Sequence, residues 1–264
     1  MISGLIIYNE LDIERNKWFI TKCLNAFNNE LFSLKLIDEK SALDNVSCQK
    51  VDFVINRSRN HSLVKRFEEQ GVLCFNNSFT NEIANDKSKT FNLLKEHEIE
   101  CVESLALDAI DEYPFIMKSV DGHGGKEVFL LNSKEEAEEI AKKSHKKYVY
   151  QKYMENNGDL RVYVLGNSII GAVLRHNKQD FRSNYSLGGD VEDYLPNFDV
   201  METSLKIRKI LNADFIGVDF LRIGDNFIVN EIEDPVGSRM LLQTSGTDAV
   251  SLFIDYIKDK LLHK

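Results

Sequence analysis

The 264-residue chain has only three prolines and no run of apolar residues long enough to span a membrane, which takes roughly 18 of them. Its four cysteines, Cys23, Cys48, Cys74 and Cys101, form no CxxC pair, which predicts reduced thiols in a cytoplasmic protein. The six histidines are scattered and match no zinc-ligand spacing. The N-terminal segment lacks a basic flank, so it predicts a first strand rather than a signal peptide.

Several motifs that identify common enzyme classes are also missing. The chain contains no GxSxG nucleophile elbow, no Walker P-loop and no GxGxxG. These absences argue against a serine hydrolase, a P-loop enzyme and a simple dinucleotide-binding protein. Lys and Arg number 33 against 42 Asp and Glu, a net charge of −9. We therefore expect no nucleic acid or membrane partner held by bulk electrostatics.

The chain does contain an acidic hairpin near its C-terminus. Two apolar runs, 215–223 and 227–232, flank a Gly-Asp-Asn turn, which predicts a β-hairpin. In such a hairpin Asp219 lies opposite or next to Glu231. Because side chains alternate along a strand, Glu233 shares the face of Glu231.

Three carboxylates on one patch of a sheet repel one another, so we expect a positive group between them. A magnesium ion meets this need, because it binds carboxylate oxygens and completes its shell with water and phosphate. The alternative is a solvated acidic edge, against which the apolar residues among the acids argue. Pro235 ends the second strand and so places the acids at a strand end.

The predicted elements suggest three regions. Residues 1–82 alternate strands and helices, which indicates an α/β layer with a mostly parallel sheet. Residues 83–150 combine a helix capped by Asp86 with two strands joined by a glycine-rich turn. Residues 151–264 contain two hairpins and an amphipathic C-terminal helix. No low-complexity linker separates the regions, so we expect tightly joined lobes.

Two polar turns, 56–60 and 76–78, follow predicted strands of the first region. Ligands of open α/β sheets lie beyond the carboxyl ends of strands, so both turns could face a ligand. The paired Arg57 and Arg59 would suit a carboxylate substrate. The alternative, that these residues simply form loops, stays open.

A strand that ends in lysine and a glycine-rich loop form a candidate phosphate site. Lys118 ends an apolar strand, and Gly122, Gly124 and Gly125 follow it. Glycines let backbone N–H groups approach phosphate oxygens, and the lysine supplies a point charge. Lys87 lies in the first turn of the preceding helix, whose end favours anions. An ordinary glycine turn of a hairpin is the alternative.

Basic and amide side chains follow the strand of the later hairpin. Arg175 ends that strand, and Arg182 and Asn184 come soon after it. Together they could hold phosphates or a developing anion. A polar surface loop is the alternative.

Several motifs occur in a fixed order: the lysine strand with its glycine loop, QKYM, DLR, DFRSN, GVD and EIE. In this order and spacing the chain resembles the ATP-grasp superfamily, most closely its RimK-like branch of amino-acid and glutamate ligases. The likeness runs from about residue 51 to the C-terminus. It implies an α/β fold with α+β lobes: a Rossmann-like pre-grasp domain at 1–82, a glycine-loop lobe at 83–150 and a metal-binding lobe at 151–264.

The resemblance also implies roles for individual residues. Residues implied to bind ATP are Lys87, Lys118, Gly122, Gly124, Gly125, Gln151, Lys152, Tyr153, Met154, Asp159 and Ser183. Within that set, the segment 151–154 would hold adenine and Asp159 would reach the ribose. Residues implied near the transferred phosphate are Arg175, Arg182, Ser183 and Asn184. Ligands implied for one or two magnesium ions are Asp219, Glu231 and Glu233.

The chain departs from the family pattern at two places. The family usually ends its metal strand with E-x-N, a small residue, proline and glycine, whereas here Glu233 and Asp234 replace the asparagine and the small residue. The family commonly follows DFRSN with a His-Arg pair, which is Tyr-Ser-Leu at 185–187 here. The loss of that basic pair puts acidic acceptors in question. One hypothesis is that Arg239 replaces it.

The implied reaction is ATP-dependent joining of a small-molecule or peptide carboxylate to an amine through an acylphosphate, with release of ADP and phosphate. Metal ions and basic side chains would neutralise the phosphoryl oxygens. Two alternatives stay open: a phosphotransferase on the same scaffold, and a non-catalytic ATP-binding regulatory module. A homo-oligomer is compatible with the sequence.

Overall fold

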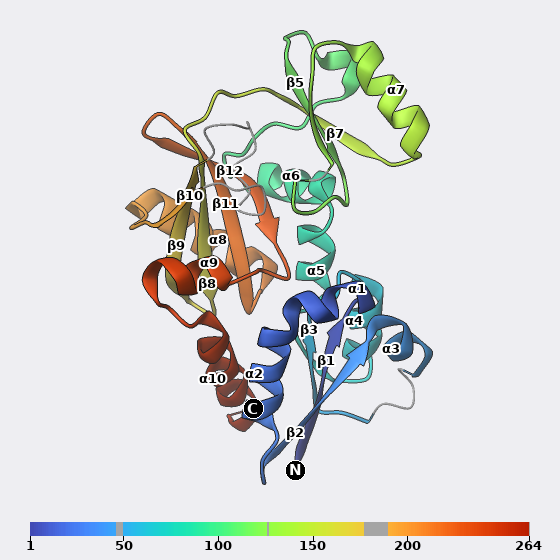
Figure 1. The fold of residues 1–264 in the computed structure, drawn as a ribbon, viewed down its shortest axis with the longest axis vertical. Coiled ribbons are helices and arrows are strands. Elements are labelled where there is room, and N and C mark those ends of the chain that lie inside the picture. The colour runs from blue at the N-terminus through green and yellow to red at the C-terminus, as the bar shows by residue number, and fades with distance from the viewer. Residues whose placement is uncertain (46–49, 126, 177–189, 264) are drawn as a thin grey trace.

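The computed structural model describes residues 1–45, 50–125, 127–176 and 190–263. These residues form three sheets with helices packed against them (Figure 1), which agrees with the predicted mixed α/β class. Within the described ranges, no helix has the length and apolar character needed to cross a membrane.

The N-terminal region is a four-stranded parallel sheet in the order β2-β1-β3-β4. Its strands are β1 (Ile2–Tyr8), β2 (Phe32–Asp38), β3 (Phe53–Asn56) and β4 (Leu73–Phe75). Its helices are α1 (Glu10–Ile13), the 3-10 turn Glu14–Asn16, α2 (Lys17–Phe27), α3 (Glu39–Asn45), α4 (His61–Glu68) and α5 (Ser78–Ala84). Because side chains of β1 alternate, Leu5 and Ile7 pack into one core. Ile6 and Tyr8 pack into another on the opposite face.

The glycine-loop lobe is a three-stranded antiparallel sheet in the order β6-β5-β7. Its elements are α6 (Lys87–Glu96), the 3-10 turn Leu107–Ala109, β5 (Phe115–Ser119), β6 (Val128–Leu131), α7 (Lys134–Ser144) and β7 (Tyr148–Lys152). The side chain of Asp86 caps α6, as predicted. The strand β7 crosses the boundary expected at residue 150, and the division into three domains stays a proposal.

The C-terminal lobe is a five-stranded antiparallel sheet in the order β10-β9-β8-β11-β12. Its strands are β8 (Asp159–Leu165), β9 (Ser168–His176), β10 (Asp190–Asp193), β11 (Phe215–Ile223) and β12 (Asn226–Glu233). Its helices are α8 (Phe198–Leu211), α9 (Arg239–Ser245) and α10 (Ala249–Leu262). Both predicted hairpins, β8–β9 and β11–β12, are present.

One hydrophobic core joins the N-terminal sheet to the C-terminal lobe. It runs from Phe27 and Phe53 to Phe215 and Phe253, and Figure 1 shows α10 beside α2. The sheet of the glycine-loop lobe has a separate, smaller core around Phe115, and Leu94 of α6 packs into a core of the C-terminal lobe. The N-terminal region and the C-terminal lobe therefore form one packed body, to which the glycine-loop lobe is attached.

Candidate functional site

A cleft of about 890 Å³ lies between the glycine-loop lobe and the C-terminal lobe. Residues predicted to bind ATP or magnesium that line it are Lys87, Lys118, Gly122, Gly124, Gly125, Gln151, Lys152, Tyr153, Met154, Asp159, Asp219, Glu231 and Glu233. They come from α6, from the strands β5, β7, β8, β11 and β12, from the loop after β5 and from the segment after β7. The fold thus brings together residues that are far apart in the sequence, although their roles stay predictions.

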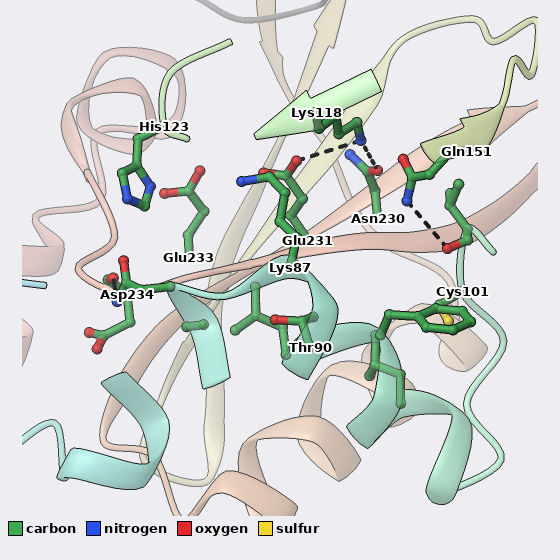
Figure 2. Close-up of a pocket in the computed structure, with 16 residues that line it drawn as sticks. Lys87, Thr90, Cys101, Lys118, His123, Gln151, Asn230, Glu231, Glu233 and Asp234 are labelled. Atoms are coloured by element: carbon green, nitrogen blue, oxygen red, sulfur yellow. Dashed lines mark hydrogen bonds and ion pairs between the residues drawn. The ribbon is translucent and has the colours of Figure 1, made fainter. Parts of the chain in front are cut away.

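Lys118 forms part of one wall of the cleft. It lies near the end of β5 and is only 9% exposed. Its Nζ donates to Asn230 Oδ1 at 2.9 Å and lies 3.6 Å from Glu231 Oε1 (Figure 2). Burial lowers the pKa of the Lys118 ammonium; Glu231 opposes this shift and Lys87 adds to it. A poorly hydrated ammonium beside a second lysine would gain from an anionic ligand.

The glycine-rich loop is tied to the start of α6. Lys87 Nζ donates to the backbone oxygen of Gly122 at 2.6 Å, and Lys87 N donates to Val120 O at 3.1 Å. Gly124 and Gly125 have φ angles of +66° and +72°, which L side chains rarely adopt. The two lysines and the loop therefore meet at one end of the cleft.

The acidic hairpin forms the facing wall with the predicted register. Asp219 lies directly opposite Glu231, and Gly217 lies opposite Glu233. A β-bulge follows Asp219. The expected carboxylate patch is therefore present.

Two arginines from neighbouring strands supply the positive charge that this patch needs. Arg161 of β8 donates from Nε to Asp219 Oδ1 at 2.7 Å and from Nη2 to Asp219 Oδ2 at 2.6 Å. The same Nη2 lies 2.7 Å from Glu233 Oε1. Arg175 of β9 donates to Asp219 Oδ2 at 2.7 Å and also to the Asp159 carboxylate. The acids are thus held together by guanidinium groups of the protein.

The ionisation of this cluster follows from its pairing. Burial would raise the pKa of Asp219, but Arg161 and Arg175 outweigh it and lower that pKa to about 2. Burial would lower the pKa of Arg161, yet Asp219 and Glu233 raise it well above its ordinary value. Asp219 and Arg161 are therefore both charged at neutral pH.

Arg161 was not predicted as a site residue. The signal available was its place in DLR, two residues after Asp159, on the strand of the hairpin that precedes the acidic one. Arg161 pairs with Asp219 only because β8 lies next to β11 in the sheet. That neighbour relation is not visible in the local sequence.

The donor chemistry of the acidic hairpin suits magnesium, since three carboxylates offer the oxygen ligands that this ion prefers. As they stand, each is paired with a basic side chain: Asp219 and Glu233 with Arg161, and Glu231 with Lys118. In the part of the chain that is described, no three His, Cys, Asp or Glu side chains are grouped closely enough to hold an ion. The residues fit the ion chemically, and binding it requires the arginine contacts to change.

The segment expected to hold adenine lies along the same cleft. Gln151 of β7 is buried, and its Nε2 lies 3.5 Å from Val102 O. Asp159, expected to reach the ribose, is 7% exposed and accepts a hydrogen bond from Arg175. The Asp159 carboxylate is therefore already engaged by the protein.

A second pocket of about 600 Å³ adjoins the cleft and shares Lys87, Lys118 and Glu231 with it. Figure 2 shows Lys87 and Glu231 in its middle, with His123 and Asp234 on one side. This side pocket therefore opens beside the end of the cleft that holds the two lysines.

The polar turns of the N-terminal region are used in protein contacts. Arg57 is buried, and its Nη2 donates to Val236 O at 2.8 Å. Arg59 pairs with Asp12 at 3.0 Å. No residue of 56–60 or 76–78 lines either pocket. The alternative that these residues simply form loops therefore describes the two turns better than a contact with substrate does.

The two unusual residues after the acidic hairpin also make contacts within the protein. Asp234 is buried and accepts from Asn76 Nδ2 at 2.9 Å and Asn81 Nδ2 at 2.8 Å. Arg239 starts α9, is exposed, and donates to the backbone oxygen of Arg15 at 2.9 Å. Arg239 lines neither pocket, which gives no support to the hypothesis that it replaces the missing basic pair.

Three predicted residues, Arg182, Ser183 and Asn184, lie outside the described residues. Arg175 is buried and lines neither pocket, and its guanidinium donates to the carboxylates of Asp159 and Asp219.

Comparison with known proteins gives matches over most of the chain. The family model of the RimK-like ATP-grasp domain matches residues 84–257. The MG011 homolog of Mycoplasma pneumoniae is 27% identical over 246 residues, which cover 90% of this chain and 86% of that protein. A probable alpha-L-glutamate ligase of Haemophilus influenzae strain Rd is 28% identical over 212 residues, which cover 75% and 70%.

The fold is similar to that of D-alanine–D-alanine ligase from Bacillus anthracis complexed with ATP. The TM-score is 0.78 at 15% identity, with 100% of this chain and 98% of that chain covered. The predicted ATP-grasp fold is thereby confirmed. Together with the family match, these relatives support ATP-dependent ligation as the general activity. The chain belongs to the RimK-like ATP-grasp family.

Proposed function

We propose that the protein joins a carboxylate to an amine and forms a C–N bond at the expense of ATP. A carboxylate oxygen attacks the terminal phosphorus of ATP, the bond to ADP breaks, and an acylphosphate forms. The amine nitrogen then attacks the acyl carbon and loses a proton, and inorganic phosphate leaves.

The observation that carries this proposal is the composition of the cleft. Lys118 and the glycine-rich loop form one wall, and the carboxylates of the acidic hairpin form the other. Phosphoryl transfer depends mainly on positioning and on neutralising the phosphoryl oxygens, and it needs no nucleophilic side chain. The cleft supplies the charges that this chemistry requires.

Each wall has its own role in the proposal. Lys87 and Lys118 bind the phosphates, and the backbone of residues 151–154 holds adenine. Bound magnesium, held by Asp219, Glu231 and Glu233, would neutralise charge on the phosphoryl oxygens. Arg175, Arg182, Ser183 and Asn184 are proposed to act near the transferred phosphate.

The side pocket beside Lys87 is the proposed place for the second substrate. It opens next to the phosphate end of the cleft, as an acceptor that attacks an acylphosphate requires. Because one similar protein is named a glutamate ligase, glutamate is the first acceptor to test. The pocket is lined by both acids and lysines, so neutral and cationic amines are tested alongside glutamate.

The test is ADP release in the presence of amino acids, small peptides and carboxylates, with mass spectrometry of the product. Asp219→Asn, Glu231→Gln and Glu233→Gln should each lower turnover by about 100-fold or more. Asp225→Asn, in the exposed turn of the same hairpin, is the control and should leave turnover unchanged.

An amide product supports the ligase, and a phosphate ester would identify a phosphotransferase instead. ATP consumption that is unchanged in the three variants would contradict the proposal. ATP binding with no turnover on any substrate of the panel would favour a regulatory module.

A further inference from the structure

Each carboxylate of the proposed metal site is held by a basic side chain of the protein. Arg161 takes both oxygens of Asp219, at 2.7 and 2.6 Å, and one oxygen of Glu233 at 2.7 Å. Lys118 lies 3.6 Å from Glu231. Of Arg161 and Lys118, only Arg161 contacts two of these three acids.

The position of Arg161 is set by strand pairing. The β8–β11 register places Arg161 directly opposite Asp219. Gly217 packs beside this side chain, since a Cβ added at Gly217 would lie 3.5 Å from Arg161 Cδ, an ordinary contact distance. The Arg161 side chain is only 8% exposed. The guanidinium therefore lies between the carboxylates of Asp219 and Glu233, two of the proposed metal ligands.

The local charges determine what a metal ion must do there. Arg161 and Arg175 face the carboxylates of Asp159, Asp219 and Glu233. A divalent ion added to this cluster would take the oxygens that Arg161 now holds and leave a buried guanidinium without an anion, which is costly. A nucleotide phosphate in the cleft would supply the new anion that the guanidinium needs.

We propose that Arg161 is a displaceable counter-ion of the metal site. It holds Asp219 and Glu233 while the cleft contains no nucleotide, and it transfers to the nucleotide's phosphate when metal and ATP bind together. Metal binding is therefore weak without nucleotide and strengthened by it. This inference rests on the proposed metal site and adds to it that metal affinity depends on bound nucleotide.

The test measures binding of Mn²⁺, an ion that takes the same oxygen ligands, by the electron spin resonance of free Mn²⁺. Without nucleotide, Arg161→Gln should bind Mn²⁺ at least about tenfold more tightly than the wild type, because Arg161 no longer competes for Asp219 and Glu233, and only the single Arg175 bond to Asp219 remains. Magnesium without nucleotide should also raise the Tm of Arg161→Gln more than that of the wild type. Arg222→Gln on β11, whose Nε contacts the turn oxygen of Gly224, is the matched control and should behave as the wild type.

Arg161→Lys provides a second variant in case the glutamine variant fails to fold. A lysine keeps the charge but loses the bidentate contact, so its affinity for Mn²⁺ should lie between those of the other two proteins. Equal nucleotide-free affinity in the wild type and the folded Arg161 variants overturns this inference alone. Failure of every protein to bind Mn²⁺, even with a non-hydrolysable ATP analogue, overturns the metal site as well.

Discussion

Three basic side chains that contact carboxylates at or beside the acidic hairpin are kept away from water. Lys118, Arg161 and Arg175 are 9%, 6% and 3% exposed, and each contacts at least one carboxylate. Removing one partner of a buried ion pair costs about 3–5 kcal/mol, because the other charge stays buried alone. Variants at these positions must therefore be assayed for stability as well as for activity.

Burial also shifts the pKa of Asp214, a residue that lies away from the cleft. Burial raises its pKa to about 6, although the hydroxyl of Tyr256, at 2.7 Å, and Lys260 oppose the shift. The folded state therefore prefers the protonated acid. The stability that this proton contributes is complete below about pH 4 and is lost as the pH rises through about 6.

We predict that Asp214→Asn is more stable than the wild type by about 2 kcal/mol at pH 8, since asparagine does not ionise. The difference should shrink towards zero at pH 4. Urea denaturation at the two pH values measures it, with the exposed Asp225→Asn as the control. A variant no more stable than the wild type at pH 8 would show that Asp214 ionises without cost.

At the scale of elements, the β8–β9 pair positions the arginines. Asp159 pairs with Arg175 in this register, and Arg161 pairs with Val173. If the register of β8 shifted by one residue relative to β9, the side chains of Asp159 and Arg161 would point to the other face of the sheet. Gly158 directly precedes β8 and has a φ of +125°. A Cβ added at this position would lie 2.4 Å from Arg175 O. Only glycine fits this close approach of two backbones.

We predict that Gly158→Ala lowers the free energy of unfolding by more than about 2 kcal/mol, from backbone strain and a clash with a paired strand. Gly224→Ala is the comparison, because Gly224 has a φ of +59° and nothing within 4 Å of an added Cβ. That variant should lose only about 1 kcal/mol, from strain alone. Urea denaturation of both variants gives the difference. Equal losses would mean that the contact with Arg175 O relaxes freely.

At the scale of the whole molecule, the N-terminal region holds the end of the acidic hairpin in place. Asn76 and Asn81 donate to the Asp234 carboxylate, and Asn85 Nδ2 donates to Asp234 O at 2.8 Å. Asp234 directly follows Glu233, so these amides fix the strand that carries the carboxylates. The sheet of the glycine-loop lobe has its own core, and α6 of that lobe packs through Leu94 into a core of the C-terminal lobe.

We predict that Asp234→Ala lowers the free energy of unfolding by about 2–4 kcal/mol, because two buried amides lose their acceptor. It should also weaken ATP binding, since Glu231 and Glu233 lie on the strand that it anchors. Calorimetry and nucleotide titration measure the two effects, with Asp225→Ala as the control. Unchanged unfolding in Asp234→Ala would show that Asn76 and Asn81 find other partners.

The local pattern of the sequence was sufficient for the hairpins, the helix caps and the order of motifs. The β11–β12 hairpin follows from one turn and the alternation of its flanking residues, and the Asp86 cap follows from a few neighbouring positions. The order of motifs pointed to the ATP-grasp family, which the comparisons confirm. The hairpins and the helix caps depend on contacts between residues that are close in the chain, so a local pattern is enough to predict them.

Only the tertiary structure decided which cations meet the acids and how the polar turns are used. Arg161 reaches Asp219 because β8 lies between β9 and β11, and Asn76 reaches Asp234 because the N-terminal sheet packs on the C-terminal lobe. The sequence by itself determined that three carboxylates share a hairpin and need a positive partner. The partner was decided by pairing and burial between distant segments, which no local pattern records.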